Sequence, residues 1–311
     1  MTRHVVVTGG AGFIGSNIAD AYVEHGWRVT VIDNLSGGDR RNVHARAEFH
    51  QLDIRDPAAA ALIRELKPDV INHHAAQMDV RKSVEDPGAD ADVNIVGSLR
   101  ILEAATDAAV KRFLFASTGG AIYGEPVDVP QSESHPTAPL SPYGCAKLAV
   151  EHYLHYYRVV RGLSSVALRY ANVYGPRQNA HGEAGVVAIF VGRLIDGQKS
   201  TINGSGDQTR DFVYVDDVVA ANLAASEGAW QGEYNVGTGV ETSINGLYAS
   251  LASIAGVDIA AVHGPAKEGE QLRSVLDGSR LRALVKLSER VALSDGLAKT
   301  FAWFRDRERT R

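Results

Sequence analysis

One stretch decides the fold predicted for this chain: His4-Val5-Val6-Val7-Thr8-Gly9-Gly10-Ala11-Gly12-Phe13-Ile14-Gly15. Its β-branched apolar run is typical of a strand that is buried on both faces. The glycines form a tight turn, and an amphipathic helix begins after them. A strand, a glycine turn and a helix together bring backbone N–H groups to a pyrophosphate at the positive end of the helix. We therefore expect a dinucleotide to be bound by Gly9, Gly12, Phe13, Ile14 and Gly15.

A second apolar run, Arg28-Val29-Thr30-Val31-Ile32, is followed at once by Asp33. An acidic residue about 20 residues after the glycines completes the dinucleotide fingerprint. Its carboxylate would accept hydrogen bonds from the adenosine ribose and would repel a 2′-phosphate, which favours NAD over NADP. Arg40 and Arg41 keep the alternative open, because they could contact a phosphate if their loop folds back.

Strand and helix patterns then alternate along the chain. Strands are expected at 48–53, 69–76 and 111–118, and helices at 57–66 and 94–109. This succession predicts an α/β fold with a Rossmann-type, doubly wound parallel sheet that binds ligands at the carboxyl ends of its strands. Asp53 and Ile54 would then lie at the end of the third strand, near the adenine.

The character of the sequence changes after the strand expected at 163–170, where glycine, asparagine and proline become frequent. We expect residues 1–172 to form an NAD-binding domain. Residues 173–311 would form a smaller, mixed α/β substrate-binding domain, with part of 211–240 packing back on the first domain.

Composition excludes several classes of protein. Apolar residues make up 45% and charged residues 22% of the chain, as in ordinary soluble proteins. The net charge of −5 gives no sign of the positive charge that nucleic-acid-binding proteins carry. The single cysteine, Cys145, excludes an intrachain disulfide, and adjacent His73 and His74 would point to opposite faces of a strand, so no metal site is expected. No apolar run is long enough to cross a membrane and no signal peptide precedes the first strand, which predicts a cytoplasmic protein.

The segment Ser141-Pro142-Tyr143-Gly144-Cys145-Ala146-Lys147 carries the predicted chemistry. Ser141 is suited to cap a helix and Pro142 to its first turn. Tyr143 and Lys147 are four residues apart and would share one helix face. A nearby ammonium favours the phenolate, so Tyr143 is a candidate general base, and Lys147 could also hold the nicotinamide ribose.

A third catalytic group is expected at the end of the strand at 111–118. Ser117 and Thr118 both supply a hydroxyl at the carboxyl edge of the predicted sheet. One of them could bridge Tyr143 and the substrate hydroxyl. Thr118 is favoured and Ser117 stays open as the alternative.

These motifs resemble the extended short-chain dehydrogenase/reductases. The resemblance rests on Thr8–Gly15, Asp33–Ser36, Ser117-Thr118 and the pair Tyr143 and Lys147. Within that family, residues 75–81, 168–178 and 210–217 are similar to NAD-dependent sugar-nucleotide epimerases, including UDP-glucose 4-epimerases. The 4,6-dehydratases of the superfamily have an acidic pair where this chain has Gly119 and Gly120, which weighs against dehydration.

The resemblance implies further binding residues. Those implied for NAD, besides Asp33, Ser117, Tyr143 and Lys147, are Asn34, Ser36, Asp53, Ile54, Ala75, Ala76, Gln77, Asn94 and Tyr170. Those implied for a UDP-sugar, besides Thr118 and Tyr143, are Arg81, Asn172, Val187, Phe190, Arg210 and Arg273, with Lys267 as an alternative to Arg273. Independently of the resemblance, Arg210 ends a glycine-rich loop that suits an anion.

The implied activity is 4-epimerisation of UDP-glucose and UDP-galactose with NAD. Small Ser274, where some relatives have an aromatic residue, would also admit N-acetylated sugars. Rival interpretations are a UDP-glucuronate 4-epimerase, another NAD-dependent sugar-nucleotide oxidoreductase, or a dinucleotide-sensing regulator without activity. The resemblance also implies a homodimer built on helices at 94–109 and 142–160, where Tyr153, Tyr156 and Tyr157 form an aromatic cluster.

Overall fold

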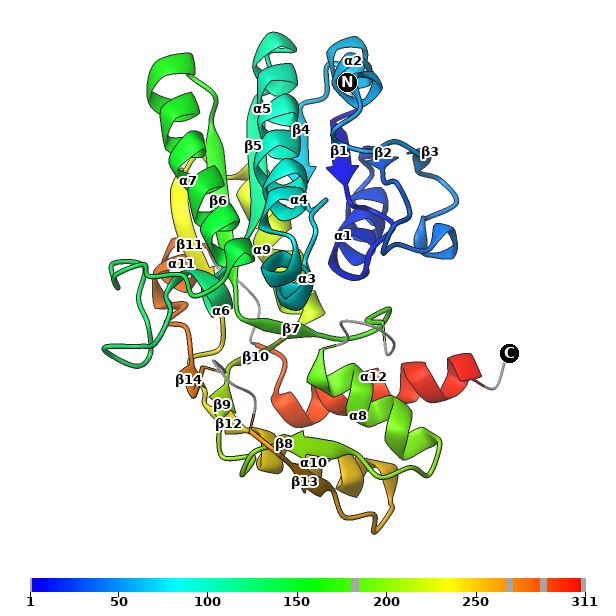
Figure 1. The fold of residues 1–311 in the computed structure, drawn as a ribbon. Coiled ribbons are helices and arrows are strands. Elements are labelled where there is room, and N and C mark those ends of the chain that lie inside the picture. Colours follow the sequence, from blue (N-terminus) through cyan, green and yellow to red (C-terminus); the bar gives the residue numbers. More distant parts are fainter. Residues whose placement is uncertain (1, 180–184, 267–270, 286–289, 309–311) are drawn as a thin grey trace. The chain divides into compact units, whose positions relative to one another are not determined.

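The computed structural model describes residues 2–179, 185–266, 271–285 and 290–308. The chain divides into two compact units (Figure 1). The first unit contains Met1–Ile122, Thr137–Arg169 and Val219–Tyr234. The second contains Tyr123–Pro136, Tyr170–Val218 and Asn235–Arg311. The assignment of one domain to the cofactor and another to the substrate stays a prediction.

A seven-stranded sheet forms the centre of the first unit, in the order β11-β6-β5-β4-β1-β2-β3. Its strands are β1 (His4–Thr8), β2 (Arg28–Ile32), β3 (Glu48–His50), β4 (Val70–His73), β5 (Arg112–Thr118), β6 (Ser165–Tyr170) and β11 (Gly232–Val236). The pairs that join β3, β2, β1, β4 and β5 are parallel. The order reverses between β1 and β4, where doubly wound sheets bind their ligands. The predicted fold class is confirmed.

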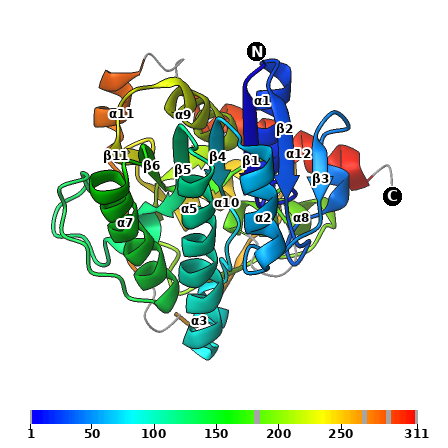
Figure 2. The same ribbon diagram turned by 90° about the horizontal axis from the view of Figure 1, so that it is seen from above.

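Helices cover both faces of this sheet (Figure 2). One face carries α1 (Phe13–Glu24) and α9 (Val215–Glu227), and the other carries α2 (Pro57–Leu66), α5 (Ser98–Asp107) and α7 (Pro142–Arg161). Under the second group lies an apolar core that includes Ile63, Leu102, Phe113 and Leu154. Burial of such side chains is the main force that holds helix to sheet.

Short elements complete the first unit. They are η1 (Arg40–Asn42), α3 (Val80–Glu85), α4 (Pro87–Ala91), the π-helical turn η2 (Asp92–Gly97) and α6 (Gly119–Ile122). The helix expected at 94–109 is thus a π-helical turn that continues into α5. No helix in the described part of the chain is long and apolar enough to cross a membrane.

The second unit is built from three small sheets and four helices in its described residues. The sheets pair β7 (Asn172–Tyr174) with β10 (Phe212–Tyr214), β8 (Thr201–Asn203) with β13 (Val262–Gly264), and β9 (Thr209–Arg210) with β12 (Thr242–Ser243) and β14 (Arg273–Ser274). The helices are α8 (Val186–Ile195), α10 (Ile244–Ala255), α11 (Ser279–Leu284) and α12 (Leu293–Glu308).

The third strand is shorter than the sequence predicts. It ends at His50, because the Leu52 amide turns back to the His50 carbonyl at 3.1 Å. The Asp53 carboxylate then accepts the Arg55 amide at 2.8 Å, which is the local bond that lets aspartate shape a turn. Asp53 therefore lies in a turn beyond the strand, whereas the helix expected at 57–66 is confirmed as α2.

Candidate functional site

The glycine turn between β1 and α1 is packed too closely for larger residues. Gly9 has φ +70°, and a Cβ there would lie 2.6 Å from the Ala75 nitrogen. A Cβ on Gly15 would lie 2.3 Å from the Gly9 oxygen, whereas one on Gly12 would meet only that oxygen, at 3.2 Å. Gly12 caps α1 without a side chain, and the first turn has no acidic residue. The start of α1 therefore suits an anion such as a pyrophosphate.

Asp33 is fixed beside this turn. It is 7% exposed, and its carboxylate accepts the Ala11 amide at 3.0 Å and the Leu35 amide at 2.8 Å. The two arginines that could have contacted a 2′-phosphate are engaged elsewhere. Arg41 pairs with Asp39 at 2.6 Å, and the Arg40 guanidinium lies 4.5 Å from the centre of the Phe49 ring.

The residues expected near the adenine lie after β3. Asp53 accepts from Asn34 at 2.8 Å and pairs with Arg55 at 2.8 Å. The Arg55 guanidinium holds the pKa of Asp53 well below its usual range. Ile54 is buried, while Ser36 is exposed and its amide is bonded to Asn34.

The segment after β4 is hydrogen-bonded to η2. The Gln77 amide donates to Asn94 Oδ1 and Asn94 Nδ2 donates to the Gln77 carbonyl, both at 2.9 Å. Ala75 and Ala76 lie between this pair and β4, where His73 is held by Thr8 at 2.7 Å and Ser98 at 2.9 Å. Burial lowers the pKa of His73 to about 3, so this histidine is a neutral structural residue.

Tyr143 and Lys147 lie on one face of α7, as predicted. Ser141 caps the helix by accepting the Gly144 amide, and Pro142 occupies its first turn. Lys147 Nζ lies 5.7 Å from the centre of the Tyr143 ring and donates to the Ala116 carbonyl at 2.9 Å. Lys147 is only 3% exposed, and this burial lowers its pKa to about 8.

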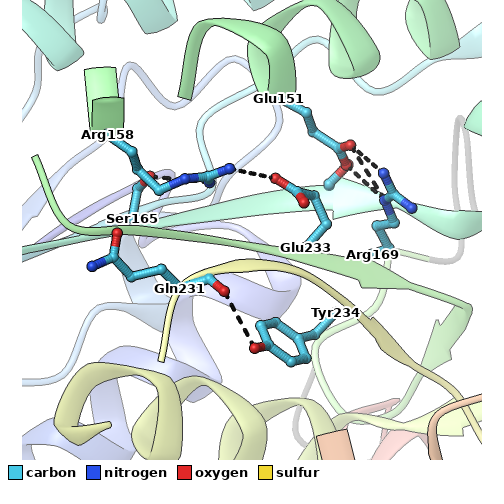
Figure 3. A network of polar contacts seen from close by, with 8 residues as sticks. Glu151, Arg158, Ser165, Arg169, Gln231, Glu233 and Tyr234 are labelled. Atoms are coloured by element: carbon cyan, nitrogen blue, oxygen red, sulfur yellow. Dashed lines mark hydrogen bonds and ion pairs between the residues drawn. The ribbon is translucent and has the colours of Figure 1, made fainter. Parts of the chain in front are cut away.

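The two hydroxyls at the end of β5 have different surroundings. The Ser117 hydroxyl is buried and donates to Glu151 at 2.5 Å. Glu151 in turn forms a buried ion pair with Arg169 at 2.6 Å (Figure 3). The Thr118 hydroxyl is half-buried and has no hydrogen-bond partner among the described residues. Thr118 is therefore the hydroxyl still available to a ligand.

The second unit holds the predicted diphosphate residues. Asn172 lies on β7, and its Nδ2 is buried without a partner among the described residues. Arg210 lies on β9 beside Arg273 and Ser274 on β14. Arg273 is engaged in a two-bond pair with Glu241, at 2.8 and 2.7 Å. A phosphate bound by Arg273 would have to compete with this carboxylate.

The other residues predicted for the substrate differ in how far their side chains are buried. Val187 and Phe190 on α8 are each 1% exposed, and Phe190 packs on Tyr248, so their side chains belong to the core of the second unit. Ser274 is also buried, as is Tyr170, which is predicted for NAD, whereas Arg81 on α3 is exposed. Lys267 lies outside the described residues.

Sequence reasoning missed several buried acids of the two units. Glu151 carried a signal, because it follows Lys147 by four residues on the same helix. Asp90 on α4 carried none, and Asp211 after β9 had only its place in the segment 210–217 that resembles the epimerases. Asp211 is fully buried and accepts the amides of Thr238, Gly239 and Leu276, which fixes the backbone next to Arg210.

Comparison with known proteins agrees with this geometry. A model of the NAD dependent epimerase/dehydratase family matches residues 5–237. A UDP-glucose 4-epimerase of Mycolicibacterium smegmatis is 44% identical over 97% of this chain and 98% of its own length. A crystal structure of UDP-glucose 4-epimerase with UDP-glucose from Thermotoga maritima is 44% identical, covers 98% of this chain and 99% of that one, and has a TM-score of 0.96. The Thermus thermophilus UDP-glucose 4-epimerase, solved in complex with NAD, is 43% identical with coverage of 97% and 99% and a TM-score of 0.91.

The family model covers most of the chain and the relatives nearly all of it, and they confirm the resemblance to extended short-chain dehydrogenase/reductases that the motifs predict. The chain therefore belongs to the NAD-dependent epimerase/dehydratase family.

Proposed function

We propose that this protein is an NAD-dependent UDP-sugar 4-epimerase that interconverts UDP-glucose and UDP-galactose. The observation that carries the proposal is the pairing of Tyr143 with the buried Lys147, which is hydrogen-bonded to β5, the strand that ends at Thr118, in the same unit as the glycine turn. The substrates are those of the relatives that match the chain over its full length.

The first unit fits NAD. The glycine turn and the open start of α1 would hold the pyrophosphate, and Asp33 would accept the adenosine ribose hydroxyls. Asp33 would repel a 2′-phosphate, and Arg40 and Arg41 are engaged with Phe49 and Asp39. The adenine would lie near Asp53 and Ile54, and Gln77 and Asn94 would line the crevice beyond β4.

NAD, when bound, supplies the group that takes a hydride from C4 of the sugar and gives it back. Tyr143 removes the proton of the sugar 4-hydroxyl and later returns it, and Thr118 orients that hydroxyl. Lys147 favours the phenolate of Tyr143 by its charge. We assign the diphosphate to Asn172 and Arg210, as the resemblance implies, and a diphosphate held in this way would let the 4-keto sugar turn over without leaving. Hydride that the bound NAD would return to the opposite face of the 4-keto sugar would give the C4 epimer.

The activity is tested by incubating the purified protein with UDP-glucose, UDP-GlcNAc and UDP-glucuronate without added NAD. We expect UDP-galactose to form from UDP-glucose, because the cofactor is regenerated in each turnover and stays bound. Conversion of UDP-GlcNAc as well would support a sugar pocket left roomy by Ser274. Conversion of the uronate alone, or no conversion at all, would contradict the proposal.

We further propose that the protein acts as a cytoplasmic homodimer that pairs through α5 and α7. A groove of about 640 Å³ lies between α2, α5 and α7, lined by residues that include Val96, Leu99, Tyr153 and Tyr156. Val96, Tyr153 and Tyr156 are 39–44% exposed, although they are large and apolar or aromatic. A surface of this kind is typical of an interface, and a two-fold axis would match it with itself.

Tyr156→Asp is expected to weaken the dimer roughly tenfold or more, because aromatic anchors contribute most to such interfaces. Sedimentation velocity over a concentration series measures this shift. Val127→Asp is the matched control, since Val127 is 77% exposed and lies outside the groove. An unchanged dimer in Tyr156→Asp, or a monomeric wild-type protein, would argue against this interface.

A further inference from the structure

The charge of Lys147 needs a partner. The residue is 3% exposed, and its one hydrogen bond among the described residues goes from the ammonium to a neutral acceptor, the Ala116 carbonyl. A buried charge is costly unless an opposite charge compensates it. Burial alone therefore disfavours the protonated form that Tyr143 requires.

Most groups around Lys147 cannot supply that compensation. At the end of β4, His73 and the next residue, His74, have pKa values lowered to about 3 by burial, so both are neutral at physiological pH. On α7 itself, Tyr143 lies one turn before Lys147 and Glu151 one turn after it. Glu151 is already neutralised by Arg169 of β6, through bonds of 2.6 and 3.0 Å.

Two acids oppose the effect of burial and raise the pKa of Lys147, Asp90 more than Glu151. Asp90 lies on α4, which packs against α7, and it is 2% exposed. Its Oδ1 accepts Gln77 Nε2 and Asn94 Nδ2, both at 2.9 Å, and no cation pairs with it among the described residues. Its Oδ2 is buried and accepts no hydrogen bond from them.

We propose that Asp90 is a positioning residue of the epimerase site: its carboxylate is the counter-charge of Lys147, and its Oδ1 holds the pair Gln77 and Asn94 in place. Neutral amide donors stabilise this carboxylate without cancelling its charge, so the charge remains available to Lys147 across the α4–α7 contact. This proposal rests on the proposed function in one respect: Lys147 is taken to favour the phenolate of Tyr143.

Asp90→Asn tests the counter-charge, because it keeps the size of the side chain and one carbonyl acceptor. We expect the pKa of Lys147 to fall by about 1 pH unit, the usual effect of losing a nearby opposite charge. The pKa is measured by ¹³C NMR on holoenzyme labelled at lysine Cε, with the signal assigned from Lys147→Met. Asp92→Asn is the matched control, since Asp92 lies two residues away but is exposed and pairs with Arg55. It should leave the Lys147 titration unchanged.

The pH profile of kcat gives a second readout. In Asp90→Asn the alkaline limb should move to lower pH by the same amount as the Lys147 titration, with KM and NAD content unchanged. If Asp90 were merely structural, the substitution would lower kcat at every pH and would not shift the alkaline limb of the profile. Asp90→Ser, which is neutral and smaller, replaces Asp90→Asn if the latter does not fold.

The outcomes separate this inference from the proposed function, because the NMR titration needs no sugar substrate. A shifted Lys147 titration in a protein that epimerises no UDP-sugar would support the counter-charge and overturn the activity. An active epimerase whose Lys147 titration is the same in wild type, Asp90→Asn and Asp90→Ser would overturn the role of Asp90.

Discussion

Tyr143→Phe is expected to convert UDP-glucose with a kcat roughly 10²–10⁴ lower than that of the wild type, the usual contribution of a positioned acid–base group. The phenol is the titratable group that lies beside the Lys147 ammonium at the start of α7. Removing one oxygen leaves the ring and its packing, so KM and bound NAD should stay near their wild-type values. The loss is measured by following UDP-galactose formation at saturating UDP-glucose.

Tyr153→Phe is the matched control for this loss. Tyr153 lies on the same helix and also loses one hydroxyl, but it is 41% exposed and lies away from Lys147. We expect its kcat to equal that of the wild type. Near-normal turnover in Tyr143→Phe would remove Tyr143 from the chemistry, and the proton of the sugar hydroxyl would need another acceptor.

The sequence predicts the local structure of the glycine turn and of the start of α7 well, for physical reasons. A glycine turn, a capped helix start and a pair four residues apart are all local features, and the structure contains each of them at the predicted residues. The limits of α2 and the position of Asp33 directly after β2 follow from equally local signals. The end of β3 is less predictable, because Asp53 and Arg55 compete with the sheet for the backbone.

Contacts between distant residues could not be predicted. Asp90 and Lys147 lie 57 positions apart, and only the packing of α4 on α7 brings their charges into the same buried region. Likewise, the sequence leaves both Ser117 and Thr118 as candidates for the catalytic hydroxyl. The structure separates them, because the Ser117 hydroxyl is hydrogen-bonded to Glu151.

The Glu151–Arg169 pair gives the largest expected effect on stability. Both side chains are nearly fully buried, at 4% and 6% exposed, and three hydrogen bonds join them. Because Glu151 is so deeply buried, water cannot readily replace Arg169 as the partner of its carboxylate. Arg169→Met would leave the Glu151 carboxylate buried with only the Ser117 hydroxyl as a described side-chain donor.

Arg169→Met is therefore expected to lower the free energy of unfolding by about 3–5 kcal/mol, which is the usual cost of an orphaned buried charge. Urea denaturation measures it. Arg64→Met breaks an exposed pair with Asp107 and should cost only about 0–1 kcal/mol. The double variant Arg169→Met/Glu151→Leu should recover most of the loss, because two apolar side chains bury no charge. If the double variant were no more stable than Arg169→Met, the loss would come from packing around Arg169 and not from the unpaired carboxylate.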